Sequence, residues 1–340
     1  MKKRIGLIVL IIIAILVIFN FDLIRYGIRQ ASGQLHIIYN ARPVEEYLND
    51  STVSQEVKDK LKLVDDVKSF AHERLHLAET DNYTEMYDQQ GQPVLWVVTG
   101  CEPFSFQPYQ WTFPVLGSVP YKGFFKKHLA DQELEDIKSK GLDAGMRTVG
   151  GWSTLGWFND PILSEMLSRS NGDLANLIIH ELVHSTIFVK DSVEFNENLA
   201  SFIADKGTLI YMSEKFGADS DEMKNYVNEE NDNKKFIRHM LSGYDILDSL
   251  YQSFEGVSEV RKLRQKEEVI KSIINNLDTL KLHNDNRLSN FKGFVPNNTY
   301  FMSFKRYQSK QGKLDSLFNK EFDQELVNFI EYLKNKHPYL

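Results

Sequence analysis

The hydrophobic and polar positions along the chain predict a first half rich in strands. Residues 53–80 carry an apolar stripe with helical spacing, and charged side chains lie between its members. A β-branched run at 94–98 predicts a strand, and the aromatic, Gly- and Pro-rich residues 103–125 predict short strands and tight loops. Residues 131–140 predict a short polar helix, and residues 146–156 predict an extended segment.

Helices dominate the predicted structure after about residue 172. Apolar periodicity predicts helices at 173–189 and 193–213, and a long amphipathic helix at 244–282 whose interior contains Gly256 as its one glycine. Residues 217–235, rich in Asp, Glu and Asn, predict an exposed loop or a loose helix. Strands that precede helices along the chain indicate an α+β fold, here predominantly helical with a small β-sheet.

A long apolar run lies close to the start of the sequence. Three basic residues at positions 2–4 precede the run at 5–21, which with its extension is roughly 20 residues long, about what a helix needs to cross a bilayer. No small-x-small cleavage site follows the run. The pattern predicts an N-terminal transmembrane helix at 1–24 and one domain at 25–340, with a buried core helix and a cleaved signal peptide as alternatives.

The basic residues before this run also predict an orientation. Because Lys and Arg resist translocation, they are expected to stay in the cytoplasm, which places everything after about residue 25 outside. The sequence therefore predicts a single-pass protein of the bacterial cell membrane, held there through its N-terminal helix, with an extracytoplasmic domain.

Composition excludes several classes of protein and of site. The chain has 340 residues, 42% of them hydrophobic, which is too apolar for a disordered protein and ample for a core. The formal net charge of −7 offers no basic field for a phosphate backbone, so no nucleic-acid partner is expected. Cys101 is the single cysteine, which excludes an intrachain disulfide and a Cys-based zinc finger. A metal site has to be built from His, Asp and Glu.

One motif carries chemistry, the sequence His-Glu-Leu-Val-His at 180–184. His180 and His184 are one helical turn apart, so both imidazoles can reach one Zn²⁺ ion. Glu181 is rotated about 100° from His180, which places it beside the metal as a general base for water. Residues 170–173 supply N-capping side chains for this helix. The alternative is a pair of histidines on a solvated helix face.

A third metal ligand is expected on the following helix. The spacing that would place a third histidine after the motif is absent, and a glutamate is the other common solution. Glu194 and Glu197 are the candidates. Asp191 and Glu194 have the spacing of a capping box, which gives Glu194 a structural role, and Glu197 is therefore the predicted ligand. Ser201 and Asp205, one and two turns further on, are candidates to support it.

Several segments together resemble a known family. The motif at 180–184 followed by Phe195-Asn196-Glu197, similar segments at 26–43, 111–125 and 153–161, and a tail with Asn298 and Tyr307 resemble the bacterial putative aminopeptidase family, a group of zincin-like metallopeptidases. The resemblance covers nearly the whole chain after residue 25. It implies a zincin-like metallopeptidase domain with one Zn²⁺ ion and a peptide substrate. It also implies Tyr307 as a catalytic hydrogen-bond donor.

The residues and the resemblance together predict a zinc-dependent peptidase, an aminopeptidase by the family's description. The ligands would be His180, His184 and Glu197, with Glu181 as general base and Tyr307 as oxyanion donor. The extended segment 146–156 could align a peptide by strand addition, with its Gly-Gly-Trp at 150–152 near the cleft. Two alternatives stay open: a membrane-anchored scaffold protein with a structural zinc, and a metal-dependent amidase acting on non-peptide or cell-wall amides.

Overall fold

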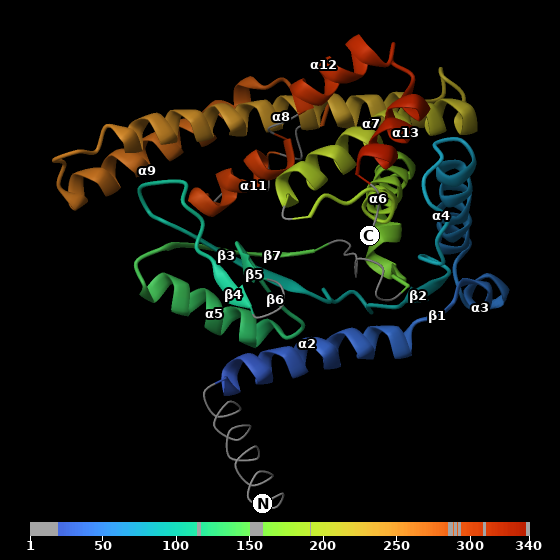
Figure 1. Ribbon diagram of the computed structural model, residues 1–340, viewed down its shortest axis with the longest axis horizontal. Helices are drawn as coiled ribbons and strands as arrows, with labels where there is room; N and C mark the ends of the chain where they lie inside the picture. Colours follow the sequence, from blue (N-terminus) through green and yellow to red (C-terminus); the bar gives the residue numbers. More distant parts are fainter. Residues whose placement is uncertain are drawn as a thin grey trace, which may run out of the picture.

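The fold of this protein is known from a computed structural model. It describes residues 20–113, 117–149, 159–190, 192–284, 288, 291, 294–308 and 311–337. The described residues form a predominantly helical α+β fold in which small sheets lie between helical layers (Figure 1). This confirms the predicted α+β class with its helical majority and small sheets. The zincin-like character of the domain stays a prediction. The separation of residues 1–24 from a domain at 25–340 stays a prediction.

The strands of the described residues form three small sheets. The first has the order β1-β2-β8, from β1 (Arg42–Pro43), β2 (Glu85–Tyr87) and β8 (Ile162–Leu163). The second is antiparallel with the order β6-β3-β7, from β6 (Lys122–Phe124), β3 (Trp96–Cys101) and β7 (Asp143–Thr148). The third pairs β4 (Trp111–Phe113) with β5 (Gly117–Val119). Of the extended segment predicted at 146–156, the first part belongs to β7, and residues 150–156 lie outside the described residues.

Helices surround the sheets on both sides. In Figure 1, α2 runs beneath the sheets, and α8 and α9 cross the top of the view. The helices of the first half are α2 (Phe21–Asn40), α3 (Val44–Asn49), α4 (Gln55–Glu73) and α5 (Lys127–Ser139). Those of the second half are η1 (Ser164–Ser168), α6 (Asn171–His184), α7 (Val193–Phe216), α8 (Asp221–Gln252), α9 (Glu259–Asn275), η2 (Asn276–Thr279), α11 (Asn298–Gln308), α12 (Gln311–Glu321) and α13 (Leu326–Lys336).

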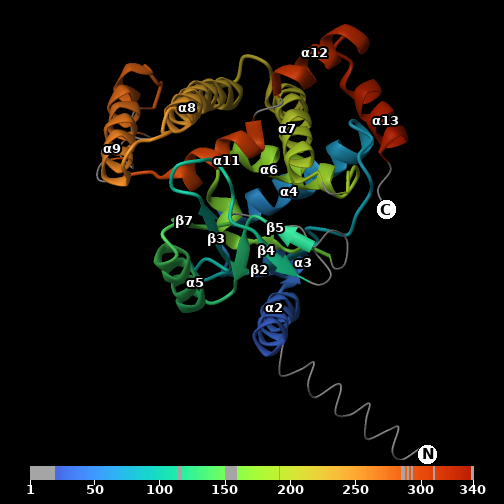
Figure 2. The ribbon, with the colours of Figure 1, turned by 60° about the vertical axis from the view of Figure 1, so that its left-hand side comes forward.

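The largest hydrophobic core lies around α6 and α7. Figure 2 shows α4 and α6 on one side of α7 and α12 and α13 on the other. Ile178 and Ile179 of α6 are fully buried, as are Ile203 of α7 and Phe329 of α13. The two helices that carry the predicted metal ligands therefore lie in the best-packed part of the molecule, where side-chain positions are held by close packing.

Two predictions about the second half need correction. Residues 217–235 were expected to be an exposed loop or a loose helix, and the loop alternative was wrong, because most of them belong to the long helix α8, which begins after the N-cap Ser220. The amphipathic helix expected at 244–282 is two helices, because α8 ends at Gln252 and α9 begins at Glu259. Gly256 lies between them with φ +71°, a left-handed conformation that glycine adopts without a steric penalty.

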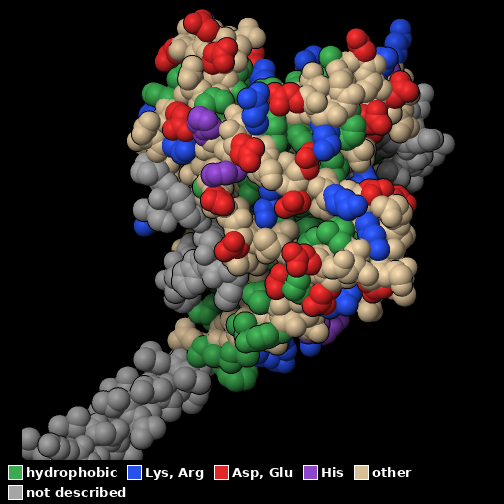
Figure 3. All heavy atoms as spheres, turned by 90° about the vertical axis from the view of Figure 1, so that its right-hand side faces the viewer, with side chains coloured by type: hydrophobic (Ala, Val, Ile, Leu, Met, Phe, Trp, Pro, Cys, Tyr) green, Lys and Arg blue, Asp and Glu red, His purple; other side chains and the backbone are tan. Residues whose placement is uncertain are grey.

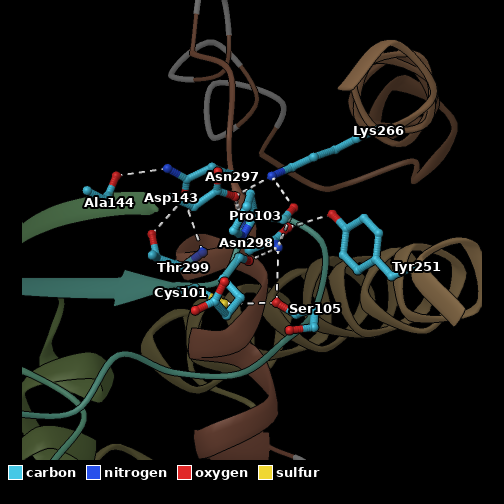
Figure 4. Close-up of polar contacts among 11 residues, drawn as sticks. Cys101, Pro103, Ser105, Asp143, Ala144, Tyr251, Lys266, Asn297, Asn298 and Thr299 are labelled. Atoms are coloured by element: carbon cyan, nitrogen blue, oxygen red, sulfur yellow. Dashed lines mark hydrogen bonds and ion pairs between the residues drawn. The ribbon is translucent and has the colours of Figure 1, made fainter. Parts of the chain in front are cut away.

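A buried polar network joins the C-terminal helices to the second sheet (Figure 4). The amide of Asn298, at the start of α11, donates to carbonyls of the loop after β3, including that of Pro103, and accepts the hydroxyl of Tyr251 at 2.6 Å. Asp143 of β7 accepts the backbone N–H of Asn298 at 2.9 Å and also pairs with Lys266 of α9. Because Asn298 and Lys266 are buried, the network fixes how α8, α9 and α11 meet the sheet.

The prediction of a single-pass membrane protein is contradicted. Within the part of the chain that the structure describes, no helix is both long and apolar enough to cross a bilayer. The helix α2 includes the residues expected to extend the apolar run, but it also carries Asp22, Arg25 and Arg29, so it is amphipathic. Residues 1–19, which hold most of the apolar run, lie outside the described residues.

Figure 3 shows one face of the molecule with its side chains coloured by type. Acidic and basic side chains are interspersed over this face, with no large field of either sign. Electrostatic attraction on this side is therefore local rather than spread over the surface.

Candidate metal centre

The helix α6 presents both histidines of the motif from its last turn. Its start is fixed by Ser170, whose hydroxyl accepts the backbone N–H of Asp173 at 3.2 Å, which confirms the predicted N-cap. The helix ends at His184, five residues before the predicted end. His180 and His184 lie one turn apart with their rings at 85° and their Nε2 atoms 3.2 Å apart. Both rings therefore face one point.

The connection from α6 to α7 is fixed by Asn196. Its side-chain amide donates to the carbonyl of Val189 at 2.9 Å, and its side-chain oxygen accepts the N–H of Val189 at 2.9 Å. Asn196 is buried, so this pair of bonds replaces water for both groups. The bonds hold the first turn of α7 against the loop after α6, and the neighbouring residue Glu197 then faces the two histidines.

Glu197 completes a cluster of three potential metal ligands. Its Oε2 lies 3.4 Å from Nε2 of His180 and 3.6 Å from Nε2 of His184. A tetrahedral zinc ion with bonds of about 2.0–2.1 Å separates neighbouring ligand atoms by about 3.3 Å. The three side chains are between 11% and 21% exposed, so the cluster is shielded but reachable. Two imidazoles and one carboxylate at these separations fit a single divalent ion.

The electrostatics of the cluster favour a charged carboxylate. Burial alone would raise the pKa of Glu197, but hydrogen bonds from His180 and His184 outweigh it and lower the pKa to about 2. Burial acts in the opposite sense on His184, whose pKa is nevertheless raised because Glu197 accepts its hydrogen bond and is negatively charged. The cluster therefore carries the negative charge of Glu197. A bound metal cation can balance this charge in place of protons.

Asp205 of α7 lies near the cluster and is hydrogen-bonded to Asn176 of α6. It accepts a hydrogen bond from the side-chain amide of Asn176 at 3.0 Å, and the same amide also donates to the hydroxyl of Tyr226 at 3.2 Å. Burial raises the pKa of Asp205 more than the bond from Asn176 lowers it. Asn176 is one turn before His180, so this network links the two helices beside the metal ligands. Ser201 is half-buried on the intervening turn of α7.

Glu181 is half-buried beside the cluster. Its carboxylate has no hydrogen bond or ion pair within the described part of the chain. Burial raises the pKa of Tyr83, a buried residue between α4 and β2, and the negative charge of Glu181 raises it further. Sequence reasoning missed Tyr83, because it lies far from the motif along the chain and follows no periodic pattern.

The remaining predicted residues lie in different places. Glu194 is exposed in the first turn of α7 and is not part of the cluster. The helix begins at Val193, after Ser192, and Asp191, the other half of the expected capping box, lies outside the described residues. Tyr307 belongs to α11, and its side chain also lies outside the described residues.

The comparison with known families gives one match, which covers most of the chain. A helix with a His-Glu-x-x-His motif and a glutamate on the next helix is an arrangement that metal-dependent peptidases use. A family described as "Putative aminopeptidase" matches residues 25–337. The chain therefore belongs to the putative aminopeptidase family. No curated protein and no solved structure matched it.

Proposed function

We propose that this protein is a zinc-dependent, zincin-like metallopeptidase, with His180, His184 and Glu197 as ligands of one zinc ion. The observation that carries the proposal is the convergence of these three side chains from α6 and α7 at separations that suit a tetrahedral ion. Membership of the putative aminopeptidase family supports peptides as substrates.

The number of ligands favours a catalytic site over a structural one. Structural zinc sites use four protein ligands, whereas catalytic sites keep one position open. Within the described residues the cluster has three candidate ligands. A purely structural site also has no use for Glu181, a carboxylate beside the cluster with no partner in the described part of the chain. This argues against the scaffold alternative.

The proposed reaction gives each of these residues a role. A zinc ion held there would supply Lewis acidity, which makes a neighbouring water more acidic and polarises a peptide carbonyl. Glu181 accepts the proton of the attacking water and later donates it to the leaving amine. The side chains of His180, His184 and Glu197 are mostly shielded from water, so electrostatic effects among them are strong.

Tyr307 is retained in the proposal as an oxyanion donor. Gln311, at the start of α12, donates to the backbone carbonyl of Asn198 at 2.9 Å, and Asn198 is the neighbour of Glu197. The chain just after α11 therefore lies against the ligand-bearing turn of α7, and Tyr307 is in the last turn of α11. β7, an edge strand of its sheet, supports the proposal that a peptide aligns by strand addition.

A variant of the general base tests the proposal. The full chain and Glu181→Gln are assayed for zinc content by mass spectrometry and for cleavage of a mixed peptide library and of non-peptide amides. We expect one zinc ion per chain in both proteins, and turnover of peptides lowered by roughly 10²–10⁴ in the variant. Glu194→Gln, which changes an exposed glutamate of α7, is the matched control and keeps full turnover.

Each contrary result identifies what is wrong. Zinc without cleavage of any amide would favour the scaffold alternative, and cleavage of non-peptide amides alone would favour the amidase. Unchanged turnover in Glu181→Gln would remove Glu181 from the mechanism.

A further inference from the structure

The helix α2 exposes a continuous apolar face to solvent. Five large hydrophobic side chains of this helix are between 38% and 80% exposed. They follow one another at intervals of three, four, seven and four residues, so they share one side of the helix. We call this side the apolar face of α2, and its members are Phe21, Ile24, Ile28, Leu35 and Tyr39. In Figure 3, hydrophobic side chains gather at the lower end of the molecule, where α2 lies. Contiguous exposed apolar surface of this kind marks an interaction site.

The opposite side of α2 holds the helix to the rest of the protein. The hydroxyl of Tyr26 and the side-chain amide of Gln30 both donate to the carbonyl of Gly123 at 3.0 Å. A Cβ atom at Gly33 would lie 2.2 Å from the ring of Phe125, so the helix approaches the protein closely there. Because α2 is fixed by this side, its apolar face points away from the protein, and packing within the fold does not account for it.

Basic side chains border the apolar face. The helix contains Arg25 and Arg29 against one acidic residue, Asp22. Neither arginine has an ion pair within the described part of the chain. Arg29 also lines a cavity of about 610 Å³ beside α2, together with His36 and Lys126, and none of the described residues that line this cavity is acidic. The border of the apolar face is therefore complementary in charge to anions such as lipid phosphates.

The sequence that precedes α2 is apolar as well. Residues 5–19 contain no polar side chain, and α2 begins at Phe21, the first member of the apolar face. An apolar environment that takes up residues 5–19 therefore adjoins the first turn of α2. A lipid bilayer accounts for the apolar face and for its basic border together. A second copy of this chain can cover the apolar face, but its own α2 offers Arg25 and Arg29 no acidic residue besides Asp22.

We propose that α2 lies along the surface of an anionic lipid bilayer, with its apolar face among the acyl chains and with Arg25 and Arg29 against lipid phosphates. Helices that combine an apolar face with basic side chains lie in the plane of a bilayer in this way. The helix does not cross the bilayer, since both arginines and Asp22 lie within its length. The inference is independent of the proposed peptidase activity.

The test places a fluorescent dye on the apolar face. Cys101, the single cysteine, is buried, so an introduced exposed cysteine can be labelled selectively with an environment-sensitive dye. Ile28→Cys carries the dye on the apolar face. Val260→Cys is the matched control, because Val260 is an apolar side chain of α9 that is 78% exposed. Each labelled full chain is mixed with vesicles of phosphatidylcholine, with or without phosphatidylglycerol. Dye emission and its quenching by spin-labelled lipid are then measured.

With vesicles that contain phosphatidylglycerol, we expect the dye at position 28 to shift its emission to the blue and to be quenched by the lipid, whereas the dye at position 260 stays in water. Residues 5–19 are the same in both proteins, so vesicle binding through them alone would leave both dyes in water and overturn the inference. A blue shift that grows with protein concentration in the absence of vesicles would place a second copy on the apolar face, and this would also overturn it.

The arginines are tested in the labelled Ile28→Cys protein. Arg25→Gln and Arg29→Gln together should weaken binding to phosphatidylglycerol vesicles by about 5-fold for each arginine, which corresponds to about 1 kcal/mol per charge near an anionic surface. Arg238→Gln with Arg261→Gln is the matched control, because both are exposed arginines on α8 and α9, and this variant should bind like the unmodified chain. Equal losses in the two double variants, or equal binding to both kinds of vesicle, would overturn the assignment of an anionic surface.

Discussion

Glu197 is the residue at which the two helices of the candidate centre meet. Its carboxylate contacts both imidazoles of α6, and its low pKa keeps it charged at any pH where the histidines are neutral. Glu194 lies one turn earlier on α7 and is exposed. The two glutamates thus have the same chemistry and nearly the same position along the chain, but only Glu197 can share an ion with the histidines.

Measuring zinc binding in variants of Glu197 and Glu194 tests which of the two is the metal ligand. In Glu197→Ala we expect zinc affinity to fall by more than the roughly 10–100-fold that loss of a supporting residue costs, because a direct ligand is removed. Glu194→Ala is the control and should keep its zinc. Equilibrium dialysis with a metal indicator measures both. If Glu194→Ala empties the site and Glu197→Ala does not, the assignment of the third ligand is reversed.

Some residues of the site follow from the sequence and others do not. The two histidines and Glu181 follow from local helical spacing, which needs no tertiary information. Glu197 also follows, because α7 comes next in the chain and packs against α6. The contact of Asn82 with Ser185, just after His184, does not, since it is a long-range hydrogen bond that no periodicity records.

The secondary-structure elements also divide into those that the sequence predicts and those that it does not. The sequence locates α6 and α7 because both have apolar faces that pack into the core. It misplaces the start of α8, whose acidic and amide side chains are typical of a loop although Tyr226 and Phe236 are buried. It also joins α8 to α9 across Gly256, because amphipathic periodicity does not show where one helix turns back beside another. Tertiary packing decides both boundaries.

The buried polar network at the start of α11 leads to a prediction about how secondary-structure elements are held together. Lys266→Met leaves Asp143 without its cation in a mostly buried site, and breaking such a pair on one side costs about 3–5 kcal/mol of unfolding free energy. Arg264→Met, on the same helix, breaks an exposed pair with Glu268 and should cost less than about 1 kcal/mol. Urea unfolding measures both variants. Equal effects would show that the buried network does not hold α9 to the sheet.

At the scale of the whole molecule, a metal ion bound at the proposed centre would couple local geometry to global stability. The candidate ligands come from two helices that lie in the largest core cluster, so an ion bound to both would be released on unfolding only when that core opens. A ligand that binds the native state alone stabilises it by mass action, by about 4 kcal/mol at a free concentration 1,000-fold above Kd. Thermal stability therefore reports metal binding independently of activity.

Removal of the metal provides the last prediction. A chelator should lower Tm by roughly 5–10 °C, and added zinc should restore it. Zinc binds neutral imidazole, so protons compete with it, and because the pKa of His184 is raised the competition begins above the usual range for histidine. The zinc-dependent shift in Tm should be complete above neutrality and disappear as the pH falls towards 5, a range in which Glu197 stays ionised. His184→Ala is the control and should show no such shift. A zinc effect that persists in His184→Ala, or that does not depend on pH, would place the ion at other residues.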